Sequence, residues 1–563
     1  MIFDLEPDTS RDAQRAAHRS DERALLLALL PRARLPATEQ ERVLQQARRR
    51  AARARALLQS HSGIEAFMQE YDLASEEGVL LMCLAEALLR IPDTATQEAL
   101  IRDKLARGHW SEHLGQSHSL LVNASTWGLI LSGRIVTLDE TDPQRRPAGI
   151  LERLVARTGE KIARVAIARA MSLLADHFVA GSSIEDALRR APMHGRARYS
   201  FDCLGEAARS AAEVERYFNA YRDAIRAIGA TSTSGDAIFD RSDISVKLSA
   251  LHPRYEYAQR ARVLNELTPR VLALAHTARA AGIGLTLDAE ETDRLELSLD
   301  IFEAVIRDPS LREWHGIGMA VQAYQKRGLA VLEWLAAVAR REGRRVPVRL
   351  VKGAYWDSEI KRAQQLGLDG YPVFTRKHAT DVSYLACARY MLAQDNAFYC
   401  QFATHNAYAV SYILSVAHDQ PFEFQRLHGM GATLYEALAE EGVNVPCRVY
   451  APVGSHEVLL PYLVRRLLEN GANTSFVNQL ADARRPIERL IVDPADVIET
   501  VDAAPHPRIP LPVHVYGDER RNSRGADISD PDTLLALDAA IARAAATSWW
   551  AAPIVGGNAV DGP

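Results

Sequence analysis

From about residue 195, short runs of β-branched or aromatic residues alternate with longer stretches whose apolar residues have helical spacing. The candidate strands begin near Arg198, Ile244, Gly284, Gly318, Pro347, Ala397, Phe422 and Cys447. Strands that alternate with helices predict a parallel sheet, and eight such units over roughly 300 residues suit a closed (β/α)8 barrel. An open doubly wound sheet is the alternative, but it favours a GxGxxG turn after its first strand, and none is present.

The segment before the barrel is rich in Ala, Leu, Arg and Glu, with apolar residues at three- and four-residue spacing, which is typical of helices. We therefore expect an α/β protein in which an all-helical region precedes the (β/α)8 barrel. The expected divisions are a helical N-terminal region at 1–100, a helical domain at 101–190, the barrel at 191–500, and a linker with a short tail at 501–563. Four prolines between Pro505 and Pro512 mark the linker.

Composition excludes several classes of protein. The formal net charge of −5 argues against a dedicated nucleic-acid binder, so we expect no nucleic-acid partner. No apolar run approaches the ~18 residues of a transmembrane helix, and the acidic start has no signal-peptide layout. The five cysteines stand apart without CxxC spacing, which fits free thiols in a reducing compartment such as the cytoplasm.

Reactive side chains of a (β/α)8 barrel lie at the C-terminal ends of its strands. These ends carry Lys247, Asp288, Gln322, Arg349, Lys352, Tyr355, Thr404, His405 and Tyr450, and a later helix carries Arg465, Arg466 and Glu469. So many cations favour anionic ligands, such as a carboxylate substrate and a diphosphate cofactor. Glu469 follows the arginine pair by three and four residues, so it can orient either guanidinium. No metal is expected, because no ligand set has a spacing such as HExxH.

Several long strings then carry a family resemblance. They include SVKLSALHPRY, LDAEETDRLELSLD, VQAYQKR, RLVKGAYWDSEIKRAQ, QFATHN and RVYAPVGSHEVLLPYLVRRLLENGANTSFVN. From about residue 100 to 530 the chain resembles proline dehydrogenases, and more closely the proline dehydrogenase half of the bifunctional bacterial proline-utilization proteins. YGDERRNSRG resembles the entrance to their aldehyde dehydrogenase half; because the sequence stops soon after it, we expect no aldehyde dehydrogenase activity.

The resemblance implies an FAD enzyme that oxidises L-proline to Δ1-pyrroline-5-carboxylate, the first step of proline catabolism to glutamate. A hydride would pass from proline C5 to flavin N5, and a quinone would accept the electrons. The resemblance also implies a cytoplasmic protein, and it leaves open a peripheral contact with the inner face of the cytoplasmic membrane and a homo-oligomeric state. Some relatives begin with a ribbon-helix-helix repressor domain. We find no such domain in this sequence, so the resemblance does not lead us to expect DNA binding.

The residue roles that the resemblance implies fall into three groups. The proline carboxylate would be bound by Lys247, Arg465 and Arg466, with Glu469 holding the arginines, and the pyrrolidine ring would lie against Leu350, Ala354, Tyr355 and Tyr450. The catalytic residues would be Arg349, near flavin N5, and Asp288, which would orient the cationic groups. The remaining cofactor contacts would come from Gln322, Lys352, Gly353, Ala354, Trp356, Arg376, Lys377, Thr404 and His405.

Two other functions are weighed against this one. A flavin-free barrel lyase would use Lys247 or Lys352 as a Schiff-base amine. An inactive scaffold would bind DNA or a membrane through the arginine-rich stretch from Leu44 to Leu58. The intact strings RLVKGAYW and RRLLE argue against an inactive site and favour the dehydrogenase.

Overall fold

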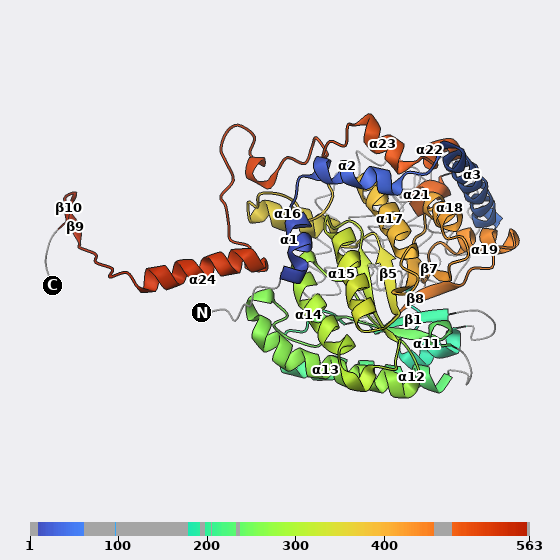
Figure 1. Cartoon of the computed structure of the whole chain (residues 1–563), viewed down its shortest axis with the longest axis horizontal. Helices are drawn as coiled ribbons and strands as arrows, with labels where there is room; N and C mark the ends of the chain where they lie inside the picture. Colours follow the sequence, from blue (N-terminus) through green and yellow to red (C-terminus); the bar gives the residue numbers. More distant parts are fainter. Residues whose placement is uncertain are drawn as a thin grey trace, which may run out of the picture.

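The computed structural model describes residues 9–60, 96, 178–191, 198–203, 205–231, 237–454, 476–482 and 484–559. At its centre, eight parallel strands form a closed barrel in sequence order, with β8 paired to β1 (Figure 1). The strands are β1 Arg198–Cys203, β2 Asp243–Val246, β3 Leu285–Leu287, β4 Ile317–Gln322, β5 Val346–Val351, β6 Phe398–Ala403, β7 Phe422–Leu427 and β8 Cys447–Val453. The predicted barrel is confirmed, and every predicted strand start is correct to within one residue.

Helices that alternate with the strands surround the barrel (Figure 1). They are α11 Ile184–Arg190, α12 Ala211–Thr231, α13 Arg260–Ala281, α14 Leu295–Ile306, α15 Gly328–Arg341, α16 Trp356–Gln365, α17 Lys377–Leu392, α18 Ala407–Val416 and α19 Ala432–Glu440. Short 3₁₀ helices lie at Thr9–Arg11, Ile238–Asp240, Leu248–Ala250, Tyr257–Gln259, Thr292–Arg294, Pro309–Leu311 and Pro512–His514. Helix ends follow local chemistry: Gly282 ends α13 in the left-handed conformation, and the Asn406 side chain caps α18.

The N-terminal helices lie outside this layer (blue in Figure 1). They are α1 Asp12–His18, α2 Glu22–Ala33 and α3 Ala37–Ser60. Helix α2 packs on α17, and α3 packs on α18 and α19. Most of the region predicted as helical between residues 61 and 177 lies outside the described residues. The arginine-rich stretch lies on α3, where Arg50 is paired with Glu441 and Arg53 with Glu440.

The C-terminal segment returns over the barrel and then leaves it. Helices α21 Phe476–Ala481, α22 Ile487–Leu490 and α23 Pro494–Thr500 lie beside the barrel, whereas α24 Pro531–Ala545 and the β9–β10 hairpin (Ile554–Val555, Asn558–Ala559) extend away from it (Figure 1). The side chain of Arg19, which follows α1, ties the start of α24 to the N-terminal helices by contacting Asp527 and Asp530 at 3.2 and 3.0 Å. Within the described ranges, no helix combines the length and the apolar character that crossing a bilayer requires.

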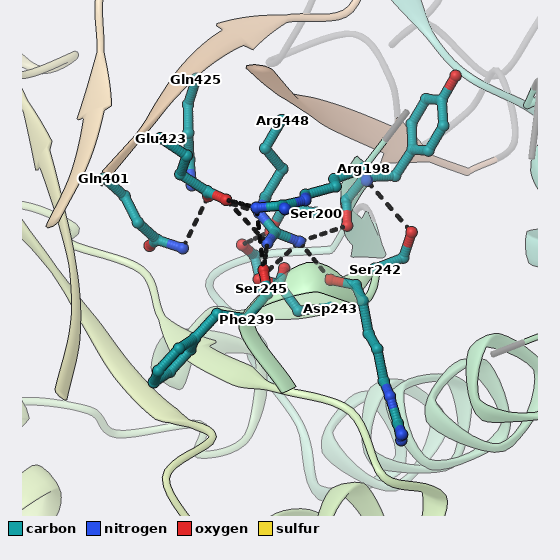
Figure 2. A network of polar contacts seen from close by, with 12 residues as sticks. Arg198, Ser200, Phe239, Ser242, Asp243, Ser245, Gln401, Glu423, Gln425 and Arg448 are labelled. Atoms are coloured by element: carbon teal, nitrogen blue, oxygen red, sulfur yellow. Dashed lines mark hydrogen bonds and ion pairs between the residues drawn. The ribbon is translucent and has the colours of Figure 1, made fainter. Parts of the chain in front are cut away.

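The inside of the barrel is polar at the amino ends of its strands, whereas branched aliphatic residues fill many barrels of this type. Glu423 of β7 is fully buried and accepts from Arg448 of β8 at 2.6 and 3.0 Å (Figure 2). Arg448 also approaches Asp243 of β2 at 3.4 Å, and Arg198 of β1 approaches Glu423 at 3.3 Å. We call these four residues the floor cluster. Its two guanidinium groups and two carboxylates balance each other beneath the carboxyl ends of the strands.

Candidate active site

Four of the predicted site residues meet at the carboxyl ends of strands β2, β3, β5 and β8. Asp288 connects them, because its carboxylate accepts from Arg349 at 2.7 Å, from the Tyr450 hydroxyl at 2.7 Å and from Lys247 at 3.3 Å. The guanidinium of Arg349 also lies 5.1 Å from the centre of the Tyr450 ring, close enough for a cation–π contact. Residues that are 41 to 203 positions apart in the sequence thus form one hydrogen-bonded group.

Asp202, at the end of β1, is a member of this group that sequence reasoning missed. Its Oδ2 lies 2.6 Å from Lys247 Nζ, which is shorter than the lysine's contact with Asp288, and its side chain is fully buried. Alternation along the strand could have identified it, because Ser200 and Asp202 are two residues apart and share one face. We call Asp202, Lys247, Asp288, Arg349 and Tyr450 the upper cluster.

Charge pairing sets the protonation of the upper cluster. Burial lowers the pKa of Lys247, but the carboxylates of Asp202 and Asp288 outweigh burial and hold that pKa well above its ordinary value. Burial raises the pKa of Asp288, but Lys247 and Arg349 outweigh it and keep that pKa below its ordinary value. At neutral pH Lys247 is therefore an ammonium and Asp288 a carboxylate.

Arg349 is held from every side by buried partners. Its Nε donates to Gln425 Oε1 at 2.7 Å, and its Nη2 donates to the hydroxyls of Ser200 and Ser245 at 2.8 and 2.9 Å. With its bond to Asp288, all three guanidinium nitrogens have acceptors. The planar group is therefore fixed in the barrel interior rather than free to rotate.

A cavity of about 420 Å³ opens beside the carboxyl ends of β5 and β6. Its walls come from the starts of α17 and α18 and from the segment between Arg485 and His506. Among the charged residues of its lining, cations outnumber carboxylates: Lys352, Arg376, Lys377, Arg485 and Arg489 stand against Asp381. The structure thus brings together three of the predicted cofactor residues, and it adds two arginines from the C-terminal segment that sequence reasoning missed.

The cations of this cavity are partly engaged already. Lys352 forms an ion pair with Asp381. Arg376 donates to the main-chain oxygens of Ala504 and Pro505 at 2.7 and 3.2 Å. The C-terminal segment is therefore attached to the cavity wall by one of the residues predicted to bind the cofactor.

The turn between β5 and α16 carries three further predicted residues. Gly353 has φ +128°, and a Cβ there would lie 2.4 Å from the ring of Tyr324. A larger residue at this position would therefore clash with the aromatic ring that packs against it. Ala354 is exposed, and Tyr355 is partly exposed at the N-cap of α16. Trp356 donates its indole N–H to Phe374 O at 2.8 Å and packs against the hydrophobic cluster that contains Tyr324.

Three predicted cofactor residues at other strand ends have local hydrogen-bond roles. Gln322 donates to Glu290 O at 3.1 Å and accepts from Gln325 at 2.6 Å. Thr404 is buried, and His405 Nε2 accepts from Leu427 N at 3.1 Å. None of these three lines the cavity.

Leu350 is separated from the upper cluster. Neighbouring residues of a strand point to opposite faces, and Arg349 points into the barrel, so Leu350 points outward. It is fully buried in the hydrophobic core. Strand alternation thus directs it to the helix layer, and its place against a substrate ring stays a prediction. Arg465, Arg466 and Glu469 lie outside the described residues.

Comparison with known proteins is consistent with this geometry. The family model described as "Proline dehydrogenase" matches residues 185–479, more than half of the 563 residues. The bifunctional protein PutA of Salmonella typhimurium is 48% identical over 99% of this chain and 43% of its own length, and that of Rhizobium meliloti is 50% identical over 88% and 40%. A crystal structure of a Bradyrhizobium japonicum proline utilization A variant, 48% identical, matches with a TM-score of 0.73 over 92% of this chain and 52% of that one. The chain thus spans less than half the length of these two curated relatives.

A second family model, described as "DNA-binding domain of Proline dehydrogenase", matches residues 63–178. Its description names DNA binding, which stands in tension with our expectation of no nucleic-acid partner. Apart from residues 96 and 178, the matched segment lies outside the described part of the structure. Both matches carry the same family name, and together they extend from residue 63 to residue 479. The chain belongs to the proline dehydrogenase family.

Proposed function

We propose that this chain oxidises L-proline to Δ1-pyrroline-5-carboxylate with FAD as its cofactor. The observation that carries the proposal is the upper cluster, which places an ammonium, a guanidinium and two carboxylates together at the carboxyl ends of the strands. In (β/α)8 barrels this end of the strands holds the reacting groups. The family match supports proline as the substrate.

The residues of the cavity fit FAD through the chemistry of their donors. A diphosphate needs cations and N–H donors, and the cavity has Lys352, Arg376 and Lys377 beside the amino end of α17. Helix N-termini attract phosphate groups because their backbone N–H groups and macrodipole favour negative charge. When FAD is bound, its flavin ring supplies the acceptor for the substrate's hydride. Gln322, Gly353, Ala354, Trp356, Thr404 and His405 are proposed as further cofactor contacts.

Within this proposal, the residues of the chain bind, orient and stabilise charge. Arg349 stabilises negative charge that develops on the reduced cofactor, because its guanidinium is buried and already oriented. Asp288 stays ionised, so it orients Arg349, Lys247 and the Tyr450 hydroxyl and does not serve as a proton acceptor at its lowered pKa. Tyr355 and Tyr450 are proposed to border the pyrrolidine ring, as is Ala354.

The substrate carboxylate needs cations that are not already neutralised. Lys247 faces two carboxylates, Asp202 and Asp288, so its charge is largely compensated. We therefore propose that Arg465 and Arg466 supply most of the attraction for the carboxylate, with Glu469 orienting them. Replacing either arginine by methionine should raise KM for proline sharply and leave FAD bound. Wild-type proline affinity in either variant would remove these two residues from the proposal.

The Schiff-base alternative has less support than the dehydrogenase. A lysine must lose its proton to attack a carbonyl, whereas Asp202 and Asp288 raise the pKa of Lys247 well above its usual value despite burial. Lys352 is also paired, with Asp381. Borohydride with a carbonyl substrate would trap a stable adduct on the protein only if a lysine forms a Schiff base.

We further propose a membrane quinone as the electron acceptor of a cytoplasmic enzyme that touches the bilayer peripherally. A quinone in the bilayer can accept electrons only if the reduced protein approaches the membrane surface. Co-sedimentation with anionic lipid vesicles, before and after reduction by proline, tests this contact. A short-chain quinone that does not reoxidise the reduced protein would contradict the acceptor.

The first test of the function is the visible absorption spectrum of the purified chain before and after anaerobic addition of L-proline. Flavin absorption that bleaches with proline is the expected result. Flavin absorption that stays unchanged would keep the cofactor and refute the substrate. A colourless protein that remains inert after reconstitution with FAD would refute both.

A further inference from the structure

We infer that Gln425 is a positioning residue, whose side-chain amide holds the guanidinium of Arg349 in the orientation that the reaction uses. This role rests on the proposed function, in which Arg349 stabilises charge on the cofactor. Gln425 lies on β7, and the family resemblance implies no role for it. It connects the floor cluster at one end of the barrel to the upper cluster at the other.

The contact between the two residues is short and buried. Arg349 Nε donates to Gln425 Oε1 at 2.7 Å, and the two side chains are 3% and 1% exposed. The other two guanidinium nitrogens have acceptors of their own in Asp288, Ser200 and Ser245. Among the described residues, Gln425 is the acceptor for Nε. Without it, a buried charged group would keep an unsatisfied donor, unless the guanidinium rotated away from its place.

The floor cluster decides which way the Gln425 amide faces. An amide has a donor end and an acceptor end that can exchange places by rotation. Here Gln425 Nε2 donates to Glu423 Oε1 at 2.9 Å. Burial raises the pKa of Glu423, but Arg448 outweighs it and keeps that pKa below its ordinary value, so Glu423 is ionised and can only accept. The amide nitrogen must therefore face Glu423, and the amide oxygen must face Arg349.

The chain offers a matched control in Gln401 of β6. Its Nε2 donates to the same Glu423 Oε1 at the same distance, 2.9 Å, and its side chain is 2% exposed. Gln401 also pairs in register with Arg349 and with Glu423 on the neighbouring strands. Among the described contacts, however, it makes no hydrogen bond to Arg349. Replacing Gln401 thus removes an equivalent bond to the floor cluster and leaves the Arg349 contact in place.

The test compares Gln425→Met with Gln401→Met in the full chain reconstituted with FAD. The measurements are the rate constant of flavin reduction by L-proline, the midpoint potential of the bound flavin and the thermal unfolding midpoint. We expect Gln425→Met to slow reduction by about 10- to 100-fold, as for loss of a hydrogen bond to a charged group. Its flavin potential should become more negative, because Arg349 would stabilise the reduced cofactor less. Gln401→Met should keep the wild-type rate and potential while losing similar thermal stability.

The outcomes separate this role from the proposed function. Equal rates and potentials in the two variants would overturn the positioning role and show that loss of barrel packing explains both. If Gln425→Met does not fold, Gln425→Asn keeps the amide but shortens its reach, and the same differences are expected. A wild-type chain that proline cannot reduce would refute the proposed function instead. A crystal structure of the variant then decides the positioning role, because an Arg349 side chain unmoved from its wild-type place would overturn it.

Discussion

The floor cluster gives the sharpest prediction for stability. Glu423 is fully buried and receives two bonds from Arg448, at 2.6 and 3.0 Å, and one each from Gln401 and Gln425, both at 2.9 Å. The substitution Glu423→Gln keeps the shape of the side chain and removes its charge, so no cavity is created. What remains is the cost of leaving Arg448 and Arg198 in the interior without this carboxylate, and of replacing one acceptor oxygen by an amide nitrogen that cannot accept from the donors around it.

The magnitude follows from the contacts that survive. Removing one partner of a buried ion pair costs about 3–5 kcal/mol. Arg448 would still approach Asp243 at 3.4 Å and donate to the main-chain oxygens of Arg241 and Phe239 at 2.7 Å, which favours the lower end of that range. We therefore expect Glu423→Gln to lower the free energy of unfolding by about 3 kcal/mol. With an unfolding entropy of about 2.1 cal/mol/K per residue over the roughly 300 residues of the barrel, that corresponds to a fall in Tm of roughly 4–5 °C.

Urea unfolding at 25 °C, followed by far-ultraviolet circular dichroism, measures this loss as a lower midpoint at an unchanged slope. The control is Glu440→Gln, which removes a carboxylate that Arg53 contacts at 2.6 Å on the surface, where the side chain is 46% exposed; its midpoint should not move. The Glu423 carboxylate stabilises the fold above its ordinary pKa of 4.5, and this contribution is lost as the pH falls through its lowered folded pKa. The difference between wild type and Glu423→Gln should accordingly shrink in acid. A loss below about 1 kcal/mol at pH 7 would refute the ion-pair reasoning.

Three further predictions concern single positions. Gly353→Ala should weaken FAD binding and lower Tm more than Gly343→Ala does. Both glycines have positive φ, but a Cβ at 353 would lie 2.4 Å from a ring, whereas nothing lies within 4 Å of a Cβ at 343. Equal losses of Tm in thermal unfolding would contradict the packing argument. Arg376→Met should raise the Kd of FAD roughly tenfold through loss of a charge-assisted phosphate contact, as measured by flavin fluorescence titration, and unchanged affinity would remove Arg376 from the cofactor site. Burial raises the pKa of Glu359 to about 7, so the free energy of unfolding of the wild type should fall as pH rises from about 4.5 to 7. Relative to wild type, the free energy of unfolding of Glu359→Gln should rise by about 2–3 kcal/mol across that window. If urea unfolding gives the same difference between the two proteins at pH 5 and at pH 8, the raised pKa is refuted.

The fold was predictable because its determinants are local. Each strand is a short β-branched or aromatic run bounded by turn residues, and its start can be read from the sequence within one residue. The strand ends then identify Lys247, Asp288, Arg349 and Tyr450, because parallel strands bring their carboxyl ends to one side of a barrel. The mutual contacts of these four residues follow directly from that arrangement.

The partners of the site were harder to predict because they depend on register and closure. Asp202 pairs with Lys247 only because β1 and β2 are neighbours with Asp202 opposite Ser245. The spacing of residues in the sequence does not predict which residues of the two strands lie opposite each other. Gln425 reaches Arg349 across the barrel interior, from β7 to β5, with β6 between them. The two cavity arginines from the C-terminal segment depend on where that segment returns. The outward direction of Leu350, in contrast, follows from the sequence alone, since strand alternation from Arg349 requires it.

The charge balance of the barrel interior explains why substrate binding needs residues from outside it. The floor and upper clusters together hold four cations, Arg198, Arg448, Lys247 and Arg349, and four carboxylates, Glu423, Asp243, Asp202 and Asp288. Buried charges are tolerated when they are paired in this way, so the interior of the barrel is stable without a ligand. The same pairing leaves no excess positive charge in these clusters to attract a carboxylate. A proline carboxylate must then be recruited by cations that these clusters do not contain, which is the part that the proposal gives to Arg465 and Arg466.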